Sequence, residues 1–108
     1  MRPYILAAML LLCCGLLFVG PAFAASQTVI QNGRRFHPGE ITVAKGDTVT
    51  FTNNDEFIHQ IYVSGPGFSF DTTEKSPGEN DTETFTTAGT FAVQCHIHPK
   101  MKLVVHVN

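Results

Sequence analysis

Short runs of alternating apolar and polar residues, separated by turn-forming sequences, extend from residue 27 to residue 107. Alternation with a period of two indicates β-strands with one buried face, and the 3.6-residue periodicity of helices does not appear. Glycine, asparagine and aspartate mark the turns, for example at Ala88-Gly89. The sequence therefore predicts an all-β protein, a β-sandwich of about seven strands. The predicted strands span residues 27–31, 40–44, 48–53, 57–63, 82–87, 90–94 and 102–107, and Phe68 and Phe70 mark a further short edge strand.

The same alternation assigns side chains to the buried or the solvent face of each strand. Within residues 57–63, His59 shares a face with three apolar residues, and at the end of the 90–94 strand Cys95 shares a face with Phe91 and Val93. Both residues therefore stand at the ends of inward-facing rows, where they can meet at one end of the sandwich. Taken alone, a histidine or a cysteine on an apolar face is more often a packed core residue than a ligand.

We interpret residues 1–24 as a secretory signal peptide. Arg2 precedes an apolar run at residues 5–19, and Ala22-Phe23-Ala24 has the small-x-small pattern of a signal peptidase site. Cleavage before Ala25 predicts a periplasmic protein whose single domain spans residues 25–108, with no stable membrane insertion. An uncleaved anchor is the alternative, because the apolar segment is long enough to span a bilayer.

The predicted mature chain is mildly acidic and poor in sulfur. Its six Lys and Arg residues stand against nine Asp and Glu residues, a balance that does not favour nucleic acid or anionic membranes as partners. A chain of 84 residues buries only a marginal core, so a stabilising cross-link or metal is expected. A disulfide is excluded, because Cys95 is the only cysteine left after cleavage. Met101 is likewise the only methionine left.

Soft ligands gather in the stretch Gln94 to Met101. Cys95, His98 and Met101 follow one another at spacings of three, which places them on one side of a tight, helix-like turn. His59 on a neighbouring strand can supply a fourth ligand. Two imidazoles, a thiolate and a thioether select copper over hard cations, and a His₂Cys plane with a weak axial Met is typical of type 1 blue-copper centres.

Two segments resemble the cupredoxins, the type 1 copper proteins. These are "FHPGEITVAKGDTVTFTNND" at residues 36–55 and "GTFAVQCHIHPKM" at residues 89–101. The short spacing of the loop ligands is most similar to amicyanin, while the overall pattern is also plastocyanin-like. The resemblance implies a Greek-key β-sandwich, one copper ion, and four ligands that map onto the positions His59, Cys95, His98 and Met101. It also implies redox protein partners: a dehydrogenase or cytochrome as donor and a c-type cytochrome as acceptor.

The ligand region departs from the family pattern at three positions. Gln60 stands where the family usually has an Asn that ties the two ligand loops together, so the same hydrogen bond is not expected. Ile97 stands where the family often has Pro. His96 is an additional imidazole, and we expect it to face solvent rather than bind copper, while His37 and His106 are expected to have no ligand role.

These features predict a monomeric carrier of single electrons, not an enzyme. His98 is the expected route for the electron, at an apolar patch that includes Ile97 and Pro99. Lys100 and Lys102 beside the loop are expected to attract an acidic partner. Two alternatives remain: a periplasmic copper-delivery protein that uses the same ligands, and a β-sandwich interaction module with an incidental cysteine.

Overall fold

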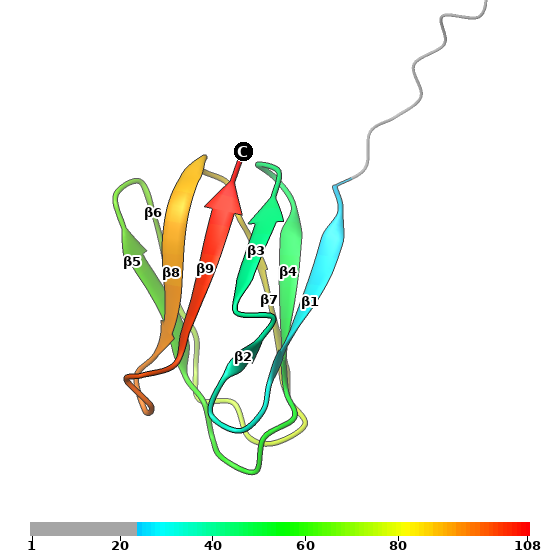
Figure 1. Cartoon of the computed structure of the whole chain (residues 1–108), viewed down its shortest axis with the longest axis vertical. Helices are drawn as coiled ribbons and strands as arrows, with labels where there is room; N and C mark the ends of the chain where they lie inside the picture. The colour runs from blue at the N-terminus through cyan, green and yellow to red at the C-terminus, as the bar shows by residue number, and fades with distance from the viewer. Residues whose placement is uncertain (1–23) are drawn as a thin grey trace, which may run out of the picture.

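The computed structural model describes residues 24–108, so residues 1–23, almost all of the predicted signal peptide, lie outside the described part. Residues 24–108 form nine β-strands and no helix (Figure 1). The strands are β1 (Ser26–Gln31), β2 (Phe36–His37), β3 (Glu40–Val43), β4 (Thr48–Asn53), β5 (Ile61–Gly65), β6 (Phe68–Asp71), β7 (Asn80–Thr84), β8 (Gly89–Cys95) and β9 (Lys102–Val107).

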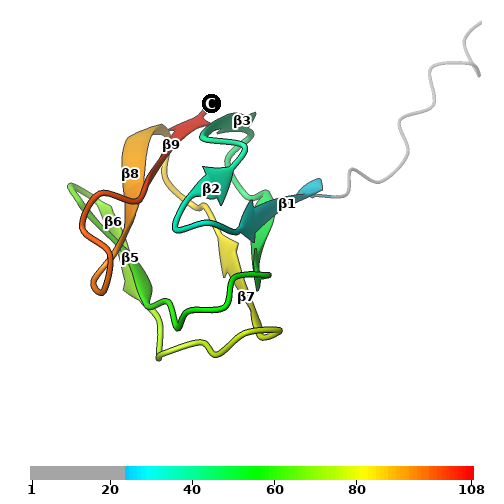
Figure 2. The ribbon, with the colours of Figure 1, turned by 60° about the horizontal axis from the view of Figure 1, so that its bottom comes forward.

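The strands form two sheets that enclose a common interior (Figure 2). One sheet has the order β2-β1-β4-β7 and the other has the order β3-β9-β8-β5-β6. Strand β1 pairs in parallel with β4, and β3 pairs in parallel with β9, whereas the remaining strand pairs of these sheets are antiparallel. The prediction of an all-β sandwich is confirmed.

Alternate residues of both sheets fill the interior, as the period of two predicts. Val29 lies beside Phe51 in the register of β1 and β4, and both side chains are buried. Phe68 of β6 closes the side of the core, with ring-centroid distances of 5.1 Å to Phe85 and 5.3 Å to Phe91. Full burial of a side chain such as Val29 or Phe51 contributes about 1.5–3 kcal/mol, whereas Phe68 is only partly buried. The other fully buried apolar residues include Val49, Ile61, Val63, Val93, Leu103 and Val105.

Several strand boundaries differ from the predicted ones. Strand β5 begins at Ile61 and not at residue 57, because residues 54–60 leave the sheet as a loop in which His59 forms only an isolated bridge with Lys75. Strand β7 spans Asn80–Thr84 and not residues 82–87, because beyond Thr84 the backbone of Phe85 bonds to Asp47 and Gly46, in the turn that precedes β4. The structure has two strands beyond the seven predicted. One is β2, which has only two residues, and the other is β6, the edge strand expected at Phe68.

The two ends of the sandwich carry different parts of the chain. The loops at residues 54–60 and 96–101 lie together at the lower end in Figure 1, whereas the last residue and the start of β1 lie at the upper end. At that upper end the amide of Lys45 donates to Asn108 at 3.0 Å, and the amide of Ala25 donates to Asp47 at 3.0 Å. Residues 24–108 contain no helix that could cross a membrane.

Candidate metal centre

The ligand candidates come from two loops that meet at one end of the sandwich. His59 precedes β5, and two backbone hydrogen bonds with Lys75 hold it there, at 2.8 and 3.0 Å. Cys95 is the last residue of β8. His98 lies in the turn that follows, and the amide of Met101 donates to the His98 carbonyl at 2.9 Å. Met101 is thereby placed directly before β9.

Three of the four candidates bring their donor atoms together. The Cys95 Sγ lies 3.6 Å from His59 Nδ1, and His98 Nδ1 lies 3.2 Å from the same atom. The three ligand atoms all lie within 4.8 Å of one another. His59, Cys95 and Met101 are buried, whereas His98 is partly exposed. The predicted meeting of His59 and Cys95 is thus observed.

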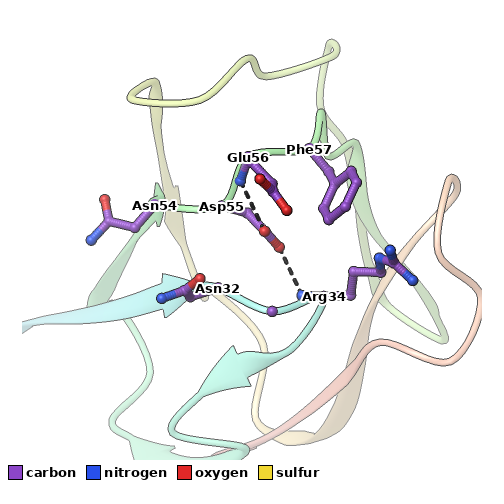
Figure 3. A pocket seen from close by; sticks show the side chains of 7 residues that line it. Asn32, Arg34, Asn54, Asp55, Glu56 and Phe57 are labelled. Carbon is purple, nitrogen blue, oxygen red and sulfur yellow. Dashed lines mark hydrogen bonds between the residues drawn. The ribbon is translucent and has the colours of Figure 1, made fainter.

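A buried carboxylate determines which nitrogen of His59 faces the cluster. His59 Nε2 lies 3.0 Å from Asp55 Oδ2, so the Nε2–H donates to the carboxylate and Nδ1 keeps its lone pair. Asp55 Oδ2 also accepts the Arg34 amide at 2.7 Å, and Oδ1 accepts the Glu56 amide at 2.9 Å (Figure 3). Burial raises the pKa of Asp55, but the hydrogen bonds from the Arg34 amide, the His59 ring and the Glu56 amide lower it more. The net pKa lies below its ordinary value, which keeps the carboxylate charged.

The environment of His98 favours a neutral ring. Burial lowers the pKa of His98, and the neighbouring His59 and Arg34 lower it further, against a smaller opposing effect of Asp55. The ring packs edge-to-face on Phe57, with centroids 5.7 Å apart, and edge-to-face on His59, with centroids 4.9 Å apart. A neutral imidazole has a free nitrogen lone pair, which is the form that binds a metal.

Backbone groups of Gln60 join the two ligand loops. Its amide donates to the Cys95 Sγ at 3.4 Å, and its carbonyl accepts the His96 amide at 2.9 Å. The Gln60 side chain turns to a different partner, the carbonyl of Thr72, at 2.9 Å. The Gln60 side chain therefore does not tie the two ligand loops together, as expected, and its backbone groups join them instead.

The other histidines do not join the cluster. His96 is exposed, and its ring stacks on Tyr62 with centroids 4.0 Å apart. His37 contacts the Asn32 carbonyl, and His106 contacts Glu40. The expectation that His96 faces solvent is confirmed.

The donor set fits a soft metal ion. Two imidazole nitrogens and a sulfur converge without a carboxylate among them, and the two nitrogens face each other at 3.2 Å, with the sulfur close by. Copper binds to such a mixture of imidazole and sulfur ligands, whereas magnesium and calcium prefer oxygen. The residues present therefore fit a copper ion.

Sequence reasoning missed Asp55 and Arg34. Asp55 belongs to an Asn-Asn-Asp sequence that is typical of a turn, which gives no sign of a contact with His59. The only hint in the sequence is that Asp55 lies four residues before His59. This spacing indicates a contact only when the conformation of the loop is known.

Comparisons with known proteins support the same interpretation. A family model described as copper binding proteins of the plastocyanin/azurin family matches residues 24–108. The chloroplastic plastocyanin of Tetradesmus obliquus is 36% identical over 72 residues, which cover 58% of this chain and 50% of that protein. The chain thus matches about half the length of this relative.

Two solved structures show the similarity of fold. A reduced variant of amicyanin superposes with a TM-score of 0.71 at 24% identity, covering 81% of this chain and 86% of that chain. The copper-containing nitrite reductase of Thermus scotoductus superposes with a TM-score of 0.71 at 31% identity, covering 85% of this chain but only 25% of that chain.

Proposed function

Because the chain belongs to the plastocyanin/azurin family of copper-binding proteins, we propose that it is a periplasmic carrier of single electrons. In this proposal His59, Cys95, His98 and Met101 are the copper ligands. The observation that carries the proposal is the convergence of His59 Nδ1, His98 Nδ1 and Cys95 Sγ within 4.8 Å at one end of the sandwich. Bound copper supplies the redox chemistry by changing between Cu(I) and Cu(II).

The role of the protein is to keep the ligands in place during that change. His59 is fixed by Asp55 and by the backbone of Lys75, and Cys95 is fixed at the end of β8 and by the Gln60 amide. Such contacts to the ligands limit their rearrangement, which suits rapid electron transfer. We propose no bond-forming step and therefore no enzymatic activity.

The partly exposed His98 is the proposed route for the electron. Its ring lies between the buried donor atoms and the surface, where Ile97 and Pro99 are exposed. Weak redox encounters use small surfaces of this kind. We propose that donor and acceptor are redox proteins, such as a dehydrogenase or cytochrome and a c-type cytochrome. The monomeric state, and the cleavage that yields the domain of residues 25–108, are part of the same proposal.

Copper delivery is the competing function with the same ligands. The additional imidazole of His96 favoured it, but that ring stacks on Tyr62 and contacts Asp71, and so is occupied away from the cluster. Reversible voltammetry with slow loss of copper to a weak chelator supports electron transfer. Rapid loss of copper to the chelator supports delivery.

A visible titration with Cu(II) tests the ligand assignment. We expect the purified protein to develop an intense thiolate-to-copper absorption band that saturates at one equivalent, because Cys95 supplies the only thiolate among residues 25–108. The Cys95→Ser variant should bind copper without this band. An unchanged band in Cys95→Ser, or no band in either protein, would contradict the proposal and favour the interaction module.

A further inference from the structure

A shallow hollow of about 640 Å³ lies beside His98. Its lining comes from the turn between β1 and β2 and from the loop between β8 and β9, segments more than 60 residues apart in the sequence. The lining residues are Gly33, Arg34, Arg35, Ile97, His98, Pro99, Lys100 and Met101.

The charge of this hollow is opposite to that of the chain. Arg34, Arg35 and Lys100 are three of the six Lys and Arg residues at positions 25–108, and among the described residues that line the hollow none is acidic. The same part of the chain carries nine Asp and Glu residues. The positive charge is therefore concentrated around the partly exposed ligand candidate. Lys102, two residues after Lys100, does not line the hollow.

Arg34 is held in place before any partner arrives. Its backbone has a φ of 57°, a conformation that few residues other than glycine adopt, and its amide is bonded to the buried Asp55. Its guanidinium lies 4.4 Å from the centroid of the Phe57 ring, and that ring in turn packs on His98. Figure 3 shows the Arg34 side chain extended alongside Phe57. An ordered charge loses little conformational entropy on binding.

The centre of the surface is apolar. Ile97 is 41% exposed and Pro99 is exposed, and both flank His98 in the sequence. An exposed apolar centre with a charged rim is the usual composition of a protein docking site.

We propose that this end of the molecule, from here called the basic face (Arg34, Arg35, Ile97, His98, Pro99 and Lys100), docks an acidic surface of a redox protein partner. The inference rests on the proposed function and names the class of its partner. Charge complementarity selects that partner over a basic protein, and repulsion between two basic faces disfavours a second copy of this chain. The overall negative balance disfavours a nucleic acid.

Binding of two c-type cytochromes, one acidic and one basic, tests this proposal. The copper(I) protein and the ferrous cytochromes are diamagnetic and exchange no electron, so backbone NMR signals can be followed while either ferrous cytochrome is added at low ionic strength. We expect the acidic cytochrome to shift the signals of Arg34, Ile97 and Lys100 and the basic cytochrome to leave them unchanged. Tighter binding of the basic cytochrome at these residues would overturn the proposal.

Charge reversal at the basic face provides the matched comparison. Arg34→Glu and Arg35→Glu should each weaken binding of the acidic cytochrome roughly tenfold at low salt. Lys45→Glu makes the same change of net charge at the opposite end and should have little effect. The hydrogen bond from Arg34 to Asp55 is donated by the backbone amide of Arg34, so Arg34→Glu retains it. An equal loss in Lys45→Glu would show that only net charge matters.

Electron transfer within the same complexes separates this inference from the proposed function. One electron passes from the copper(I) protein to the ferric haem, giving copper(II) and ferrous haem. If the acidic cytochrome docks at the basic face but no electron passes, the proposed function fails and the docking site stands. If electrons pass equally fast to both cytochromes and the charge variants change neither rate, the proposed function stands and the docking site fails.

Discussion

At the scale of single residues, His59 is oriented by groups that are not ligand candidates themselves. Asp55 accepts the Nε2–H of His59, and each oxygen of that carboxylate also accepts a backbone N–H, from Arg34 or from Glu56. The carboxylate thereby fixes the tautomer and the direction of the ring. Partners of this kind are typical of histidines that bind metals.

Replacing Asp55 by Asn should weaken copper binding. In the natural protein the Asp55 carboxylate accepts hydrogen bonds from three N–H groups. The Asn side chain has an NH₂ group in place of one oxygen, so at least one of these N–H groups would face another donor. We expect the affinity for copper to fall about 10- to 100-fold, measured by competition with a chelator. Glu56→Gln is the control, because its exposed side chain has no part in these contacts. Unchanged affinity in Asp55→Asn would show that Asp55 does not orient the ligand.

The sequence was sufficient to predict that His59 and Cys95 lie close together, but not to identify the residues that orient them. Alternation assigned both side chains to the interior, and the cluster at Cys95 to Met101 restricted their location to one end. The contact between Asp55 and His59 depends on the path of the loop at residues 54–60, which no periodic pattern describes. The ligand roles themselves stay a prediction until copper binding is measured.

At the scale of elements, the turn at residues 96–101 is attached through His96 to β5 and β6, two strands of the same sheet as β8 and β9. The His96 ring stacks on Tyr62 of β5 at an interplanar angle of 12°, and Nε2 lies 3.2 Å from both carboxylate oxygens of Asp71, at the end of β6. The His96 amide also donates to Gln60. These contacts hold the beginning of the turn directly after Cys95.

Removing the His96 ring should loosen this turn. Stacked aromatic rings contribute about 0.5–1.5 kcal/mol beyond the area that they bury, and the exposed pair with Asp71 adds little. In His96→Ala the amide of Met101 should therefore exchange with solvent about two- to tenfold faster, as measured by hydrogen exchange.

Two further variants separate stacking from other effects. His96→Phe keeps an aromatic ring over Tyr62 and should restore slow exchange, whereas His106→Ala, at a histidine of β9, should leave the turn unaffected. Equal exchange rates in all three variants would mean that the ring does not secure the turn.

Element boundaries were predicted less well than element types. The alternation identified β4 and β9 to the residue, because both have one continuous buried face. It extended β5 too far, because Phe57 and His59 keep the alternating pattern although the backbone there has left the sheet. Strand β2 has only two residues, too few for any periodicity.

At the scale of the whole molecule, β7 is an edge strand with two carboxylates on its inner face. Asp81 pairs with Phe51 and Glu83 pairs with Val49 in the antiparallel register, so these side chains share the face of the core residues. Inward-pointing charge on an edge strand prevents pairing with another chain. Burial raises the pKa of Glu83 to about 7, with further contributions from the hydrogen bond and the charge of Asp81.

This pKa predicts that stability decreases as the pH rises towards neutrality. The folded protein binds the Glu83 proton more tightly than the unfolded chain, where the pKa is near its ordinary value of 4.5. The contribution to stability is therefore complete below pH 4.5 and is lost as the pH approaches about 7. Denaturant unfolding at several pH values should show this dependence.

The variant Glu83→Gln should reduce the pH dependence and be more stable than the natural protein at neutral pH. Glu74→Gln, at an exposed residue, should retain the dependence. An identical pH profile for Glu83→Gln and the natural protein would rule out Glu83 as its source.

The fold class followed from the sequence, but the pairing of the strands did not. Seven alternating segments indicate a sandwich, yet alternation carries no information about which strands are neighbours. The parallel pairs of β1 with β4 and of β3 with β9 join segments separated by long connections. Only the resemblance to a known family implied a Greek-key arrangement, and the matched family and structures support it.

The separation between the two ends of the sandwich also determines how the molecule can be attached to a surface. The C-terminus at Asn108 and the start of β1 lie at the end away from the loop at residues 96–101, which contains His98 (Figure 1). A linker at Asn108 that immobilises the protein on a gold electrode would leave the histidine directed toward the solution. A linker at a cysteine introduced at Lys100 would turn the same histidine toward the gold surface. Two electrodes prepared in these two ways would exchange electrons with the centre from opposite ends of the molecule.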